Sequence, residues 1–417
     1  MIVVGGVIGA GIFLNPRIVA ERTGSSEGVL IAWAIGGVLA LIGALCYAEL
    51  GARRPQAGGA YVYLREAYGP MIAFVYGWIM LVVNYSGREA AVSMTFATYF
   101  CSSFDLPASL IQPIAIGAIV LLTGVSYFGI KAGAILQNAL TMLKLLAVVA
   151  LVVTGVFIAA PHAPAAAPPP VVISPWNFGA ILMPVLFAYG GWAYINNIAG
   201  EIREPQRNLP LALVLGMAAV TLVYVTMNLV YVYAMPVGDM MATPRIGEAA
   251  AARLFGDWGA RAMSLAVLVS VFGCISATVI SGPRVFYAMA RDGLFFRRLA
   301  EIHPRFRTPA HAIVFQGVWS AALCLSGTYT RLYTFVVFAA VLFYALAGAS
   351  VIVLRRKHPE WERPYRTWGY PWTPLLYVGV CVVVLGSTIV SQPKESGVGL
   401  AILALGLPAY AFWRRRA

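Results

Sequence analysis

The sequence predicts an all-α, multi-pass membrane protein with about twelve transmembrane helices, arranged as a five-plus-five inverted repeat followed by two extra helices. Sixty per cent of the 417 residues are hydrophobic and 11% are charged, which lies far outside the composition of soluble domains. Apolar runs of about 20 residues, the length that crosses a bilayer, recur along the chain. Two of these runs, about half the chain apart, are interrupted by glycine, as expected for discontinuous helices in two corresponding halves.

Windows of this length predict spans at 1–20, 27–50, 70–100, 107–127, 134–160, 177–199, 210–236, 262–289, 311–327, 331–354, 372–391 and 397–413. An even number of spans leaves both termini on one side of the membrane. Loops on that side hold 20 lysines and arginines, against 6 on the other side. Because positive residues concentrate in cytoplasmic loops, we expect both termini to be cytoplasmic and the protein to reside in the cell (inner) membrane.

A Pro/Ala-rich linker from Pro161 to Pro175, typical of a spacer, separates five spans from seven. We predict one transmembrane domain, with a first repeat at 1–160, a second repeat at 177–354 and two extra helices at 372–413. The longest external loop, 238–260, is expected to carry a short helix and to act as a lid or as a plain connector. Only eight residues precede Gly9, about 12 Å of helix, so we expect the true start of the protein to lie upstream.

Several classes of protein do not fit the composition. The net charge of +13 does not indicate nucleic-acid binding, because most basic residues lie in short loops that orient the spans. The five cysteines have no CxxC spacing, so we expect packing residues and no metal site, cofactor or disulfide framework. A membrane enzyme would need an acid, base or nucleophile constellation. We expect no enzyme, since all four histidines, His162, His303, His311 and His358, lie in loops or near span ends.

The first interruption is Gly9-Ala10-Gly11. None of these residues has a bulky side chain, so the helix can unwind and leave backbone N–H groups free at the start of the next half-helix. Such a helix terminus holds a carboxylate without a cationic side chain. The alternative is that these small residues only allow close helix packing, because Gly5-x-x-x-Gly9 matches a packing motif.

The second interruption follows Phe187-Ala188-Tyr189 and begins at Gly190. It ends a half-helix whose free carbonyl groups can accept hydrogen bonds from an ammonium group. A carboxylate site on one broken helix and an ammonium site on the other predict a site for an amino acid near the bilayer midplane.

Five segments, in order along the chain, resemble the amino acid–polyamine–organocation (APC) superfamily, and within it the bacterial relatives of the L-type amino acid transporters. These are 8–13 (IGAGIF), 55–61 (PQAGGAY), 187–192 (FAYGGW), 201–210 (EIREPQRNLP) and 282–293 (from GPR to MARDG). The resemblance covers most of the chain. It implies the inverted-repeat fold of the leucine-transporter structural class, with helices 1 and 6 discontinuous, and an amino acid permease.

The resemblance also implies roles for single residues. The stretch around Val7, Gly9, Ala10, Gly11 and Ile12 resembles the carboxylate-binding segment, although Ala10 replaces the serine of many eukaryotic relatives. Phe187, Ala188 and Gly190 resemble the amine-binding segment, with Phe187 as a gate over the substrate. Tyr224 resembles a seventh-span tyrosine that approaches the substrate, whereas its spacing alone favours a packing aromatic.

Lys144 lies in the middle of an apolar span. A buried ammonium is costly unless it is paired or neutralised, so the residue is a functional candidate. It resembles the family's fifth-span lysine, which takes the place of a sodium ion and touches spans one and eight, and Ser270 is the expected partner in span eight. This implies sodium-independent transport, with Lys144 bracing the unwound helix or carrying a proton. The alternative is a lysine that extends to the membrane interface.

Three further charged residues have weaker signals. Arg88 and Glu89 are adjacent inside the third span, so they do not face each other, and each is expected to pair elsewhere or to line the aqueous pathway. Glu49 and Arg53 are four residues apart and are expected to form an ordinary helix-end pair.

These observations favour a secondary active or exchange transporter of neutral L-amino acids that alternates access around a central site. A cationic amino acid or polyamine permease of the same fold is the alternative, but it needs acidic side chains that the binding stretches lack. A non-transporting amino acid receptor is the second alternative. Expected partners are the amino acid and the lipid bilayer, with protons as an open coupling ion and no heavy-chain partner.

Overall fold

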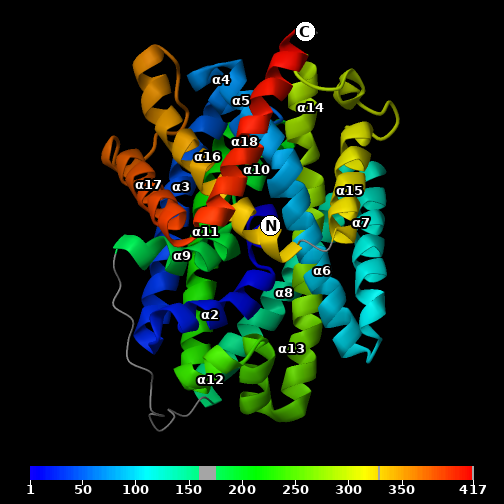
Figure 1. Cartoon of the computed structure of the whole chain (residues 1–417), viewed down its shortest axis with the longest axis vertical. Helices are drawn as coiled ribbons and strands as arrows, with labels where there is room; N and C mark the ends of the chain where they lie inside the picture. The colour runs from blue at the N-terminus through cyan, green and yellow to red at the C-terminus, as the bar shows by residue number, and fades with distance from the viewer. Residues whose placement is uncertain (159–174, 327–328, 416–417) are drawn as a thin grey trace.

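The computed structural model describes residues 1–158, 175–326 and 329–415, and every predicted span contains a helix (Figure 1). Most of the expected 161–175 linker lies outside the described residues. Within them, nine helical stretches are long and apolar enough to cross a membrane, and Asn177–Tyr189 and Ala310–Leu325 are shorter apolar helices. The prediction of an all-α membrane fold is therefore confirmed.

The first span is broken where the glycines predict. Helix α1 (Ile2–Val7) ends at Ile8, which has an extended backbone, and α2 (Ala10–Thr23) begins after Gly9. The sixth span is broken between α9 (Pro175–Tyr189) and α10 (Tyr194–Asn197), with Gly191 between them at φ 110°. Only glycine adopts this conformation without strain, so Gly191 determines where along the chain the sixth span is broken.

The remaining helices form the body around these breaks. Helix α3 (Ser26–Arg53) runs along α11 (Pro205–Ala234), and both contact the broken spans. The third span joins α5 (Pro70–Ile79), a π-helical turn η1 (Met80–Tyr85) and α6 (Ser86–Ser103). The other helices are α4 (Ala60–Tyr68), α7 (Ile111–Tyr127), α8 (Ile130–Ile158), α12 (Val237–Ala242), α13 (Ile246–Ser281), α14 (Pro283–Arg291), α15 (Ala310–Leu325), α16 (Tyr329–Lys357), α17 (Trp372–Ser391) and α18 (Pro393–Arg414).

The two ends of the molecule differ in what they contain. The C-terminal end of α18 lies at the upper end in Figure 1 with α4, and α12 lies at the lower end with the start of α13. The expected loop 238–260 is mostly helical: it contains most of α12 and the first turns of α13, which is kinked at Gly256 with φ 68°. The expected short helix is therefore present as α12, and most of the segment is helical.

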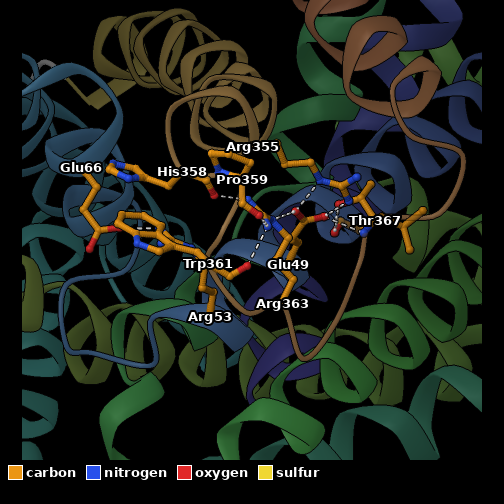
Figure 2. Close-up of polar contacts among 10 residues, drawn as sticks. Glu49, Arg53, Glu66, Arg355, His358, Pro359, Trp361, Arg363 and Thr367 are labelled. Carbon is orange, nitrogen blue, oxygen red and sulfur yellow. Dashed lines mark hydrogen bonds and ion pairs between the residues drawn. The ribbon is translucent and has the colours of Figure 1, made fainter.

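The expected pair between Glu49 and Arg53 is wrong. Glu49 lies near the end of α3, where its carboxylate accepts hydrogen bonds from Arg355 Nε at 2.8 Å, Arg355 Nη2 at 2.6 Å and the backbone N–H of Thr367 at 2.7 Å (Figure 2). Arg53 instead contacts Glu66 and lies over the ring of Trp361 at 4.0 Å. Glu49 binds residues distant in the sequence and not Arg53, because a carboxylate that is 4% exposed requires several hydrogen-bond donors.

Candidate functional site

The end of α1 is held by a buried lysine. Lys144 Nζ, on α8, donates to the carbonyl oxygens of Gly5 at 2.9 Å and Ile8 at 2.8 Å, and to that of Ser270 at 3.0 Å. The side chain is 1% exposed, which excludes the alternative that it extends to the membrane interface. An ammonium group has three donors. Two of them bind carbonyl groups at the broken end of α1, and the third binds the carbonyl group of Ser270 in the neighbouring helix α13.

Two residues of α13 contact the same unwound stretch. Ser270 Oγ donates to Ile8 O at 3.0 Å, so the structure brings Ser270 to the break together with Lys144. Cys274 Sγ lies 3.3–3.5 Å from the carbonyl oxygens of Gly5, Gly6 and Ile8. This contact could not be predicted from the sequence, because a cysteine in an apolar span is typical of ordinary packing.

Tyr224 connects the two broken spans. Its hydroxyl lies 2.8 Å from Val7 O and 3.2 Å from Ala188 O. Its ring packs against Trp33 with centroids 5.3 Å apart and against Tyr189 at 4.9 Å. The residue therefore packs as an aromatic and also bridges the two breaks, and its approach to the substrate stays a prediction.

The two breaks also touch through their backbones. A Cβ atom on Gly11 would lie 2.6 Å from Ala188 Cβ and 2.7 Å from Ala188 Cα, and one on Gly191 would lie 2.5 Å from Gly6 O. Such distances leave no room for a side chain. The glycines thus allow the start of α2 and the end of α9 to approach each other, which brings the N-terminal N–H groups of one half-helix and the C-terminal carbonyl groups of the other into one region.

The carbonyl groups at the end of α9 already have a cation. Arg88, on α6, donates from Nη2 to Gly190 O at 2.9 Å and from Nη1 to Phe187 O at 3.3 Å. Its guanidinium lies over the Phe187 ring, 4.6 Å from the centroid. The sequence indicated that Arg88 pairs away from Glu89, and the structure agrees: Glu89 accepts from Gln316 at 2.8 Å and Ser320 at 3.0 Å.

A small cavity of about 50 Å³ opens beside these groups. It lies between α3, the third span, α9, α16 and α17, and is bordered by Asn84 and Arg88, Phe187 and Gly190, and the rings of Trp192 and Tyr344. Trp192 and Tyr344 are stacked, with centroids 5.3 Å apart. Asn84 and Arg88 are four residues apart across the end of the π-helical turn, a spacing that could have indicated their common face.

The described residues give no indication of a metal centre. Within 1–158, 175–326 and 329–415, no three His, Cys, Asp or Glu side chains come together in a way that could hold a metal ion. What the region offers instead is backbone polarity: N–H groups at the start of α2, carbonyl groups at the ends of α1 and α9, and two buried cationic side chains on those carbonyls.

Two broken helices that meet within a bundle of apolar helices, beside a small cavity, are typical of membrane transporters of small solutes. A model of the family described as amino acid permease matches residues 1–405. The chain therefore belongs to the amino acid permease family of the APC superfamily, and the resemblance in the sequence is confirmed.

Individual relatives are similar along the whole chain. The serine/threonine exchanger SteT of Bacillus subtilis (strain 168) is 33% identical, over 100% of this chain and 95% of the relative. The large neutral amino acids transporter small subunit 2 of Rattus norvegicus is 32% identical, over 100% and 80% of the two chains. The b(0,+)-type amino acid transporter 1 of Homo sapiens is 34% identical, over 94% and 81%. The protein is accordingly an amino acid transporter of the membrane.

Proposed function

We propose that this protein is a sodium-independent carrier of small neutral L-amino acids, which alternates access around the two broken spans. The observation that carries this proposal is the meeting of the breaks: Gly11 lies against Ala188, and Tyr224 bridges Val7 and Ala188. The substrate carboxylate would bind the N–H groups at Gly9, Ala10, Gly11 and Ile12. Its ammonium group would bind the carbonyl groups of Phe187, Ala188 and Gly190.

Four observations support the substrate class. The cavity is small, and no Asp or Glu is among the described residues that border it, whereas a cationic amino acid or a polyamine would need a counter-charge. Arg88 adds a positive charge there, which disfavours the cationic alternative further. The name of one similar protein specifies serine and threonine, and the name of another specifies large neutral amino acids.

Lys144 supports the absence of sodium coupling. Its ammonium group already supplies a positive charge to the carbonyl groups of Gly5, Ile8 and Ser270, so a sodium ion at this position would face a fixed like charge. Whether Lys144 only braces the break or also carries a proton decides between exchange and proton symport.

We also propose that both termini are cytoplasmic, that the protein resides in the cell membrane, and that 1–160 and 177–354 are the two repeats, with 372–413 as the extra helices. A catalytic role and a heavy-chain partner are not part of this proposal. The basic residues of the loops on the terminal side support the orientation.

The proposal is tested with purified protein in proteoliposomes. Uptake of labelled L-serine and L-alanine is measured with sodium or choline outside, with and without unlabelled amino acid inside, and with and without an inward proton gradient. We expect saturable uptake that is equal in sodium and choline and that empty liposomes lack. Binding of serine without uptake would establish the receptor alternative, and uptake of lysine or putrescine in place of serine would establish the cationic one.

A further inference from the structure

One charged group that borders the cavity enters the proposed function only as a positive charge that disfavours cationic substrates. Arg88 is 7% exposed and borders the cavity. Among the described residues, none of the ion pairs within 4.0 Å includes Arg88. The neighbouring carboxylate, Glu89, is directed away, to Gln316 and Ser320.

The guanidinium group is stabilised only in part. It remains charged at any ordinary pH, and a buried charge without a counter-ion is costly. The carbonyl oxygens of Phe187 and Gly190, at the negative end of α9, and the ring of Phe187 compensate some of this cost. No carboxylate completes the compensation within the described part of the cavity wall.

The same carbonyl groups are those at which the ammonium group of the substrate would bind. A substrate ammonium and the Arg88 guanidinium cannot both occupy them, because two like charges at hydrogen-bond distance repel strongly. The guanidinium must therefore move when an amino acid binds. Because its side chain starts on α6 beside the cavity, it stays near the bound substrate after it has left Phe187 and Gly190.

We propose that Arg88 determines the charge selectivity of the site. Without substrate it occupies the ammonium subsite, and when an amino acid displaces it, its guanidinium pairs with a carboxylate on a short substrate side chain. The carrier then admits short acidic amino acids, of the size of aspartate, in addition to neutral ones, and rejects cationic ones. This inference rests on the proposed function, since it assumes that the amino acid binds between the two breaks.

The experiment compares three amino acids of similar length that differ in side-chain charge. The full purified chain is titrated with L-aspartate, L-asparagine or L-2,4-diaminobutyrate, and thermal stabilisation gives a dissociation constant for each, independently of uptake. The variants are Arg88→Gln, which removes the charge, and Arg88→Lys, which retains it. Arg17→Gln is the matched control, since Arg17 pairs with Glu21 at 2.8 Å and does not border the cavity.

We expect wild-type protein and Arg17→Gln to bind aspartate at least as tightly as asparagine, and diaminobutyrate at least about tenfold more weakly. Arg88→Lys keeps this order. Arg88→Gln weakens the binding of aspartate relative to that of asparagine by about tenfold or more, and it tightens the binding of diaminobutyrate. The proposal is overturned if aspartate does not stabilise the wild type, or if Arg88→Gln leaves the aspartate-to-asparagine ratio unchanged.

A variant that does not fold leaves the test intact, because the wild type and Arg88→Lys must both show the preference for aspartate. Failure of the proposed function gives a different result: serine then produces no uptake in proteoliposomes, whatever the ratios measured in detergent. If serine uptake is normal and Arg88→Gln leaves the ratios of the dissociation constants unchanged, only the proposed role of Arg88 is wrong, and the proposed function stands.

Discussion

Lys144 lies where the first broken helix loses its hydrogen bonds. A lysine in an apolar run was enough to single it out in the sequence, because a charge in a membrane span is rare and costly. The sequence could not supply its three acceptors, Gly5 O, Ile8 O and Ser270 O, which come from two other helices. The residue type was predictable, and its partners depended on how α8 packs against α1 and α13.

Replacing Lys144 with methionine keeps the length and apolar volume of the side chain and removes the ammonium group. Three carbonyl groups then lose a charged donor, each such bond being worth about 1.5–3 kcal/mol, and the break is no longer braced. We expect serine uptake to fall by about tenfold or more at equal protein in the membrane. Uptake in sodium should be compared with uptake in choline, because a sodium ion could bind the vacated carbonyl groups. Unchanged kinetics would assign Lys144 to packing only.

Gly11 and Gly379 form a matched pair of glycines. A Cβ atom on Gly11 would lie 2.6 Å from Ala188 Cβ, whereas one on Gly379, in α17, meets nothing within 4 Å. Gly11→Val should therefore separate the breaks and reduce uptake to the level of empty liposomes, and Gly379→Val should transport like the wild type. Both are measured as initial rates of serine uptake. Normal transport by Gly11→Val would contradict the proposed meeting of the two breaks.

At the scale of elements, the end of α3 depends on residues more than 300 positions away. Glu49 binds Arg355 at the end of α16 and Thr367 in the following loop, and Arg363 lies 3.8 Å from it (Figure 2). In the same loop, Trp361 stacks on His358, with centroids 3.7 Å apart. The spacing of four residues along one helix predicted Arg53 as the partner of Glu49. That spacing describes only neighbours on the same helix and carries no information about distant residues. A loop that folds back onto the helix offers better donors.

Glu49→Gln tests this cluster. Its removal leaves Arg355 and Arg363, both mostly buried, without their carboxylate, and breaking such a buried arrangement costs about 3–5 kcal/mol. We expect the unfolding temperature in detergent to fall by several degrees. Adding Arg355→Gln to Glu49→Gln should recover part of this loss, because the uncompensated charge is then removed as well. The exposed pair Arg17–Glu21 provides the control, and Glu21→Gln should change the unfolding temperature little.

At the scale of the whole molecule, the proposed orientation can be measured from outside the cell. The five cysteines are buried, so a new cysteine at an exposed position is the one that a reagent reaches first. Asp257 and Arg298 are both exposed, near the kink of α13 and after α14 respectively. With a membrane-impermeant maleimide on intact cells, Asp257→Cys should react and Arg298→Cys should react only after permeabilisation. The reverse pattern would invert the proposed topology.

The sequence by itself determined the class of fold and the position of the breaks, because both follow from local physics. Apolar length sets the spans, and glycine sets where a buried helix can unwind, as at Gly191 with its φ of 110°. Only the tertiary structure decided which groups fill those breaks. Arg88 on the carbonyl groups of α9 and Cys274 beside those of α1 come from distant helices, and their contacts depend on packing, which no spacing along the chain encodes.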